Sequence, residues 1–213
     1  MKSTPAPHAA PAVLGPALTF LLATATGLAV ASIYYVQPLL GLLAQQFGVG
    51  SATIGLLPTL TQLGYGAAIL LLSPLGDRYD RRRIIAVKSA ALVAALAFAA
   101  LAPSFGALGL ASVAIGLTAT LAQDLVPAAA TLAPEAERGR RVGQVMMGLL
   151  LGILWSRVAA GSLAALAGWR AVYASAAVAV ALLIRCCGAA CRASCRRRRP
   201  AMARCWRRWR GCG

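Results

Sequence analysis

The chain has 213 residues, of which 60% are apolar and only 12% are charged, and its mean hydropathy is +0.74. Soluble domains carry about 25% charged residues, so this composition excludes an ordinary water-soluble domain and predicts an all-α integral membrane protein. The formal net charge is +16, but residues 185–213 contain 10 arginines and no acidic residue. This uneven distribution argues against nucleic acid as a partner of the whole chain; the predicted partner is the lipid bilayer.

Six apolar segments follow a short N-terminal segment, 1–15, and together they occupy residues 16–184. Each is close to the roughly 20 residues that an α-helix needs to cross about 30 Å of hydrocarbon. The sequence therefore predicts six transmembrane helices, at 16–40, 53–75, 84–102, 106–132, 142–166 and 169–184.

Basic residues alternate between the connections. Arg78, Arg81, Arg82 and Arg83 follow the second segment, a further basic cluster at 138–141 follows the fourth, and the other three connections contain no Lys or Arg. Positive residues mark the cytoplasmic side, so we expect a multi-pass plasma-membrane protein with a cytoplasmic N-terminus and tail. A cleaved signal peptide is disfavoured, because its charged region would be Lys2 alone and the apolar segment continues past the candidate site at 29–31.

The connection after the second segment carries the clearest motif. Residues 73–83 read SPLGDRYDRRR, which resembles the signature loop G-x-x-x-D-R-x-G-R-R of the major facilitator superfamily, with Ser73 and Asp80 in place of the two glycines. The resemblance covers residues 14–184 and implies the N-terminal six-helix half of that fold. It also implies a cytoplasmic gating motif formed by this loop and the family's P-E-x-x-R-G element: Asp77, Arg78, Arg81, Arg82, Glu135 and Arg138.

Physical chemistry supports a gating role for these charges. Surface ion pairs contribute about 0–1 kcal/mol each, so they can bias an equilibrium between two arrangements without freezing it. We expect Asp77 to pair with an arginine of its own loop or of the 138–140 region, and Glu135 and Glu137 to meet Arg81 or Arg82. The alternative is that these arginines only set the topology.

The fifth segment resembles the antiporter motif G-x8-G-x3-G-P-x2-G-G, which implies helix packing through Gly139, Gly148 and Gly152. Ile153, Ser156 and Arg157 replace the rest of the motif, and Gly116 stands where many proton-coupled members carry an arginine. Together with similarity at 34–40 and 61–65 to bacterial efflux permeases, the resemblance implies export, with ion coupling left open.

Asp124 and Arg157 are the two charged residues that lie far from the end of a segment. Each costs about 2.5–3.5 kcal/mol at mid-bilayer, so each should face protein or a water-filled cavity. They lie about 13 Å and about 22 Å from the cytoplasmic ends of their helices, which leaves direct pairing open. Pro127 frees the Gln123 carbonyl and should kink the helix there. Candidates for substrate binding or coupling are Asp124, Arg157, Gln123, Gln62, Tyr65 and Tyr35; the alternative for Asp124 is a purely structural role.

Polar residues also sort the segments. The first, second, fourth and fifth carry nearly all of them, whereas the third and sixth are almost entirely Ala, Leu, Val and Phe. Apolar helices belong against lipid and polar ones around a cavity, so we expect the third and sixth to lie away from the transport path.

The tail, 185–213, contains all six cysteines and has no Leu, Ile, Val or Phe. Its cysteine spacing lacks a zinc pattern, and disulfides are disfavoured in the cytoplasm. The arginines and cysteines could instead serve lipid binding, acylation or RNA binding. Our preferred interpretation is disordered or out-of-frame sequence from a GC-rich gene, because all its abundant residues have G- and C-rich codons.

The sequence thus predicts a secondary active transporter for small-molecule efflux, incomplete as this chain and not an enzyme. No metal site or cofactor is expected. Such transporters hold substrate between two halves, so a missing C-terminal half or a second copy would be required. The alternative is a six-span membrane protein without transport, whose basic tail binds anionic lipid or nucleic acid.

Overall fold

A computed structural model describes residues 15–78 and 81–186 of the chain, and it describes side chains there except at 72–82. This part of the chain contains no strand. The helices are α1 (Pro16–Tyr34), α2 (Val36–Phe47), α3 (Ser51–Ile54), α4 (Leu56–Arg78), α5 (Arg81–Ala100), α6 (Phe105–Ala119), α7 (Leu121–Leu132), the 3₁₀ turn η1 (Glu135–Glu137), α8 (Arg138–Ala167) and a final helix, Trp169–Cys186.

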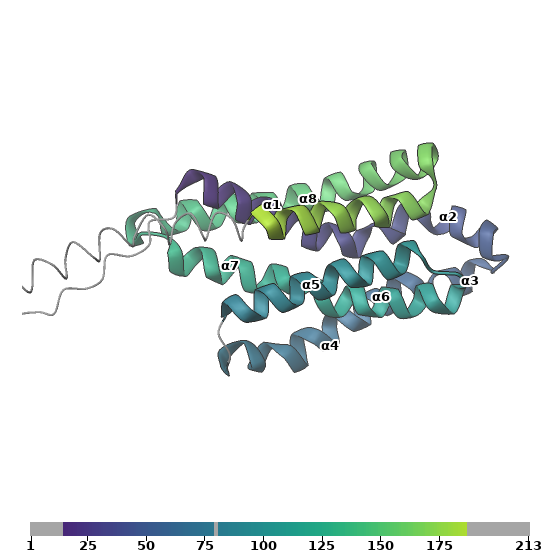
Figure 1. Ribbon diagram of the computed structural model, residues 1–213, viewed down its shortest axis with the longest axis horizontal. Helices are drawn as coiled ribbons and strands as arrows, with labels where there is room; N and C mark the ends of the chain where they lie inside the picture. The colour runs from purple at the N-terminus through teal and green to yellow at the C-terminus, as the bar shows by residue number, and fades with distance from the viewer. Residues whose placement is uncertain (1–14, 79–80, 187–213) are drawn as a thin grey trace, which may run out of the picture.

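The predicted six-span fold is confirmed. Within the described residues, six helical segments are long and apolar enough to cross a membrane. They lie side by side as one elongated bundle (Figure 1). The largest boundary differences are in the first span, which continues to Phe47 instead of ending at residue 40, and in the fifth, which begins at Glu135 instead of residue 142. The final helix continues to Cys186, so its last two residues come from the segment that we had assigned to the tail.

Three of the six spans are interrupted near their middle or start, and proline accounts for two of the interruptions. The first span breaks at Tyr35 and the second at Gly55, in each case three residues before a proline, Pro38 or Pro58. A proline ring clashes with the carbonyl group four residues earlier, so a break at this place is expected.

The fourth span breaks at Thr120, not at Gln123 as Pro127 had suggested. The hydroxyl groups of Thr118 and Thr120 donate to carbonyl oxygens one turn back, at Ala114 and Leu117. Such back-bonding bends helices, which places the bend one turn before the proline-freed carbonyl.

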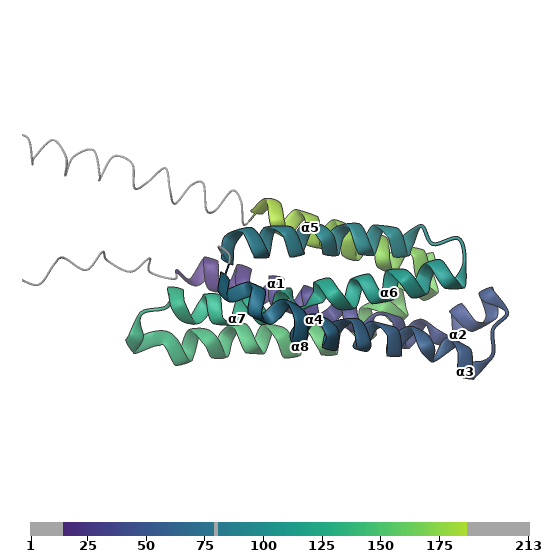
Figure 2. The same ribbon diagram turned by 90° about the horizontal axis from the view of Figure 1, so that it is seen from below.

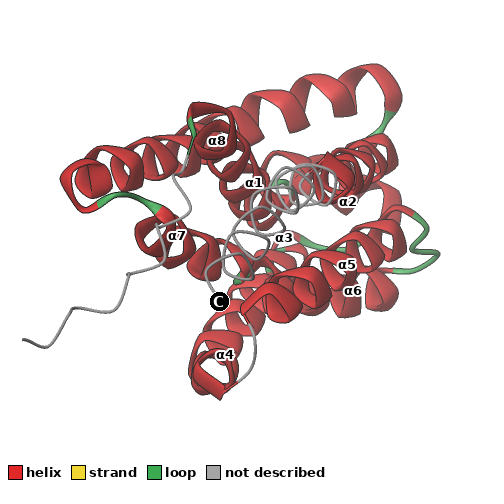
Figure 3. Ribbon diagram, turned by 60° about the vertical axis from the view of Figure 1, so that its left-hand side comes forward, coloured by secondary structure: helices red, strands yellow, loops and turns green. Residues whose placement is uncertain are grey.

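The first and fourth spans form the centre of the bundle, and the fifth lies at its edge. About half of the apolar stretch of each central span is buried, 50% and 56%, against 17% for the fifth. The α1 helix packs along α8, and α4 packs along α6. The second and fifth spans therefore flank the bundle on opposite sides of this centre (Figure 3).

The two ends of the bundle differ in charge. The end of α4, the start of α5, the α7–α8 connection with its 138–141 basic cluster, the start of α1 and the end of the final helix lie at one end (Figure 1). The other three connections, which lack Lys and Arg, lie at the opposite end (Figure 2). The basic residues of the connections are thus gathered on one face, as the topology prediction requires.

At the end opposite the basic connections, aromatic residues join the final helix to the rest of the bundle. The indole Nε1 of Trp169 donates to Gln46 Oε1, and Arg170 donates to the carbonyl oxygen of Ala102 at 3.2 Å. The Phe47 ring contacts both Trp169 and Phe105, with centroids 6.0 and 6.3 Å apart. These contacts fasten three connections to one another.

Candidate functional site

Two charged residues from different spans form an ion pair inside the bundle. Lys88 Nζ on α5 lies 2.6 Å from Asp124 Oδ2 on α7, and the two side chains are only 14% and 21% exposed. Lys88 is seven residues from the start of α5 and Asp124 eight from the end of α7. At 1.5 Å per residue, both lie roughly 10–12 Å from the charged end of the bundle, which explains why they meet.

The residue before Asp124 links the same helix to a second neighbour. Gln123 Nε2 donates to the hydroxyl oxygen of Tyr65 on α4, at 2.8 Å. Adjacent residues on α7 therefore reach α4 and α5 with hydrogen-bonding side chains. We call these four residues, Tyr65, Lys88, Gln123 and Asp124, the polar cluster.

The prediction for the third span is wrong in one respect. We expected that span to stand apart from the polar residues, yet Lys88 of α5 supplies the partner of Asp124. Lys88 lies only four residues into the segment predicted at 84–102, so it was not among the charges expected far from a segment end. In the structure α5 begins at Arg81, three residues earlier than predicted, and this brings Lys88 to the depth of Asp124.

Arg157 does not pair with Asp124. It is exposed on α8 and forms no ion pair with any residue whose side chain the structure describes. It lies 19 residues into α8, roughly 28 Å from the charged end, whereas Asp124 is roughly 12 Å from that end. The difference in depth is larger than a side chain can span.

The other two candidates occupy different surroundings. Tyr35 is buried at the break between α1 and α2. Gln62 is exposed on α4, one turn before Tyr65. Neither joins the polar cluster through a hydrogen bond among the described side chains.

The gating residues are only partly visible. The side chains of Asp77, Arg78, Arg81 and Arg82 lie outside the described residues. Glu135, the first residue of η1, and Arg138, the first residue of α8, are exposed.

Glu137 of η1, which we expected to reach across to Arg81 or Arg82, accepts from Arg141 in the first turn of α8, at 2.9 Å. Arg141 also reaches Thr19 Oγ1 on α1, at 3.4 Å. The α7–α8 connection is thereby tied to the start of α1, a contact that the sequence analysis did not identify.

Glycines bring two helix pairs into backbone contact. A Cβ atom placed on Gly148 would lie 2.5 Å from the Ala23 carbonyl oxygen, and one on Gly152 would overlap Gly27 of α1. Small residues at such spacing let membrane helices approach closely. Gly139 differs from the expectation, because a Cβ atom there would meet no other atom within 4 Å.

Gly116 forms the corresponding contact between α6 and α4. A Cβ atom at this position would overlap the carbonyl oxygen of Thr61 and lie 2.9 Å from the backbone nitrogen of Tyr65. There is no room for a side chain. An arginine, which many proton-coupled members carry at this place, would be incompatible with this packing.

Comparisons with known proteins agree with this architecture. Residues 22–202 match the model of the family described as Major Facilitator Superfamily. The chain is 46% identical over 170 residues to the uncharacterized transporter YgaY of Escherichia coli O157:H7, covering 80% of this chain and 43% of that protein. It is 39% identical over 187 residues to the probable transporter SCO4007 of Streptomyces coelicolor, covering 85% of this chain and 44% of that protein.

A solved structure shares the fold. It is the crystal structure of a bacterial homolog of the human lysosomal transporter Spinster, in an inward-facing and unoccupied conformation. The TM-score is 0.66 at 19% identity, over 78% of this chain and 41% of the other. The chain thus spans about half the length of the curated relatives and of this structure. With the family match covering most of its residues, the chain belongs to the major facilitator superfamily, a family of transporters and not of enzymes.

Proposed function

We propose that this chain forms the first half of a secondary active transporter that exports a small molecule from the bacterial cytoplasm, with proton coupling through Asp124. The observation that carries the proposal is the Lys88–Asp124 ion pair between the third and fourth spans. A charged pair inside a membrane bundle is costly to insert and hard to explain by stability alone.

The energetics favour a functional role for the pair. Replacing a buried ion pair with apolar residues is often neutral or stabilising by about 1–4 kcal/mol in soluble proteins. Charged residues within transmembrane segments are typical of substrate paths and proton relays. Retaining Lys88 and Asp124 is therefore better explained by an activity that needs a titratable group than by packing.

Protonation of Asp124 would change the contacts that hold α7. The neutral acid loses its charge attraction for Lys88, and the Lys88 ammonium group is then uncompensated inside the bundle. The geometry of the Gln123–Tyr65 hydrogen bond would change as well, because Gln123 and Asp124 are adjacent on one helix. Loading and release of one proton would thus bias the position of α7 relative to α4 and α5.

Substrate binding is assigned to the polar side chains that remain available. Gln62 and Arg157 are exposed on α4 and α8, the two spans at the edges of the bundle. Arg157 suits an anionic group on the substrate, and Gln62 and Tyr65 supply neutral donors and acceptors. Tyr35 would contribute to substrate binding or coupling from its buried position at the break between α1 and α2.

Transport would require a second six-helix unit. Apart from Arg157, the exposed surface of α8 is mainly apolar and includes Met147, Leu150, Leu154 and Trp155, which are 62–64% exposed. On α4, Leu63 and Leu70 are 64% and 78% exposed. These faces would lie against lipid and against the second half, supplied by a C-terminal half or by a second copy of this chain.

The charged end of the bundle is proposed to face the cytoplasm, with the gating motif Asp77, Arg78, Arg81, Arg82, Glu135 and Arg138 at that surface. The contacts at this end are compatible with such a role, because Arg141 joins an ion pair with Glu137 to a hydrogen bond with Thr19 of α1. Opening and closing of the cytoplasmic side would exchange such pairs.

The experiment is a pH-gradient assay in everted membrane vesicles containing a polypeptide in which this chain replaces the matching half of YgaY. A panel of compounds is screened for collapse of the gradient, which reports exchange of protons for substrate. Asp124→Asn, at matched expression, should abolish the collapse for any active compound. Unchanged exchange by Asp124→Asn would remove the proton-coupling role.

A further inference from the structure

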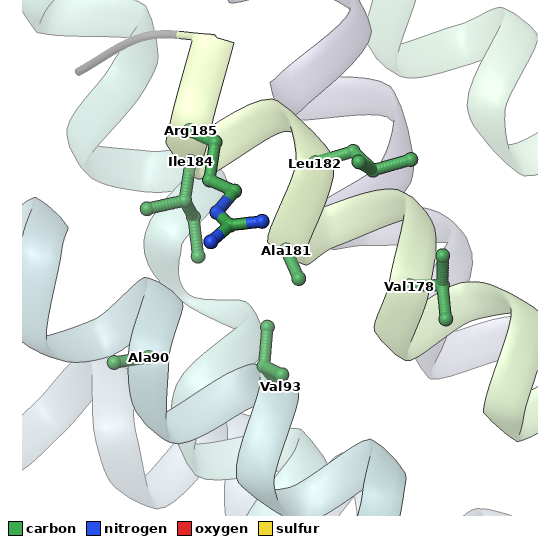
Figure 4. Close-up of a pocket in the computed structure, with 7 residues that line it drawn as sticks. All are labelled: Ala90, Val93, Val178, Ala181, Leu182, Ile184 and Arg185. Carbon is green, nitrogen blue, oxygen red and sulfur yellow. The ribbon is translucent and has the colours of Figure 1, made fainter. Parts of the chain in front are cut away.

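A groove runs between α5 and the final helix, on the side of the bundle away from α8. Its volume is about 480 Å³, which is within the roughly 300–1,000 Å³ range of small-molecule sites. Ala90 and Val93 line it from α5, and five residues line it from the final helix (Figure 4). The groove involves none of the residues assigned to transport.

The walls of the groove are open to lipid. Val178 and Leu182 of the final helix are 58% and 56% exposed, and Ala90 is exposed on α5. Both helices are long and apolar enough to span a membrane. A hydrocarbon chain is therefore the material that meets this surface, and the small side chains of Ala90 and Ala181 leave room for it.

One lining residue is charged. Arg185 lies in the last turn of the final helix, at the end of the bundle that carries the basic connections, and its side chain extends between the two helices beside Ile184 and Ala181 (Figure 4). Among the described residues, no acidic side chain lines the groove. A guanidinium group at the end of an apolar groove is complementary to a phosphate group attached to acyl chains.

We infer that this groove binds one anionic phospholipid, with an acyl chain between α5 and the final helix and its phosphate group on Arg185. The position along the helix fits, because the end of a membrane-spanning helix lies at headgroup depth, where arginine interacts with anionic lipid. The bound lipid would fill the space between α5, which carries Lys88, and the final helix. This inference does not depend on transport.

The first test measures lipid binding to the full purified chain in detergent by native mass spectrometry, with phosphatidylglycerol and phosphatidylcholine as probes. Wild type should bind one phosphatidylglycerol more tightly than phosphatidylcholine. Arg185→Gln should weaken phosphatidylglycerol binding about fivefold, the effect of about 1 kcal/mol per arginine at a membrane surface, and leave phosphatidylcholine unchanged. The matched control is Arg140→Gln, which removes an exposed arginine from α8 at the same end of the bundle.

The second test fills the groove without removing charge. Ala90→Trp places a large ring between the helices from an exposed position, so folding should be retained, and it should lower the amount of bound phosphatidylglycerol at least fivefold. Ala159→Trp, on the exposed face of α8, should leave binding unchanged.

Either of two results would overturn the inference. One is equal loss of binding in Arg185→Gln and Arg140→Gln, which would indicate a general electrostatic effect. The other is undiminished binding in Ala90→Trp, which would place the lipid elsewhere.

Discussion

The Asp124 carboxylate on α7 accepts a hydrogen bond from the Lys88 ammonium group on α5, at 2.6 Å, while Gln123, the preceding residue, donates to Tyr65 on α4. One turn of α7 therefore holds two neighbouring helices through polar side chains. Below this turn, towards the charged end, α4 and α7 diverge (Figure 1). A change of charge in the polar cluster would therefore alter the contacts between three spans.

The ion pair makes a direct prediction about stability. Lys88→Met leaves the charge of Asp124 without a partner inside the membrane. The folded state should therefore lose about 3–5 kcal/mol of stability while the carboxylate is charged, and the yield of folded protein should fall. Lys88→Met combined with Asp124→Leu removes both charges and should restore most of the yield. The measurement is the monodisperse fraction in size-exclusion chromatography of detergent extracts. A double variant no better than Lys88→Met alone would show that the two residues are not coupled.

Helix contact through glycine predicts that Gly116→Ala is destabilising. Alanine normally favours a helix over glycine by about 1 kcal/mol, but here its methyl group would overlap the Thr61 carbonyl oxygen and force α6 away from α4. The melting temperature of the purified protein should therefore fall. Gly66→Ala is the control, because a Cβ atom on Gly66 of α4 meets nothing within 4 Å; its melting temperature should be unchanged or higher. Equal effects of the two substitutions would contradict the proposed packing.

Topology is predicted by the separation of charge between the two ends. In a background with the native cysteines replaced, Gly50→Cys, in the exposed α2–α3 connection, should react with a membrane-impermeant thiol reagent added to intact cells. Ala136→Cys, exposed in η1, should react only after the membrane is opened. Reaction of both cysteines in intact cells would contradict the six-span topology, because three spans separate residues 50 and 136 and must place them on opposite sides of the membrane.

The sequence predicts the six spans well because lipid imposes a length and a composition on every crossing. Two of the helix breaks could also be predicted, since Pro38 and Pro58 each disrupt the turn before them. The break at Thr120 could not be predicted. It depends on threonine hydroxyl groups that donate to backbone carbonyl oxygens, and the sequence does not specify which partner each hydroxyl group has in the folded bundle.

The candidate site was predicted less completely. Asp124, Gln123 and Tyr65 follow from the cost of polar groups in hydrocarbon, but that cost says nothing about which helix supplies each partner. The rotation of α7 decides that Asp124 faces Lys88, and the glycine contacts at Gly116 and Gly148 set the helix spacing. In the structure, residue depth separates Arg157 from Asp124, and the start of α5 at Arg81 instead of residue 84 brings Lys88 to the level of Asp124.

The most direct test of the proposed mechanism is substrate efflux by Asp124→Asn compared with the wild type across pH 6 to 8, in a polypeptide that carries both halves. Asparagine keeps the size and most hydrogen-bonding capacity of the side chain but cannot carry a proton or a charge. Because Asn also leaves Lys88 unpaired, Asp124→Asn is compared with Asp124→Asn/Lys88→Met at matched surface expression. Both variants should lose at least about tenfold in rate, together with the pH dependence of the wild type. Wild-type rates and an unchanged pH profile in the double variant would contradict the claim that the Lys88–Asp124 pair couples protons to transport.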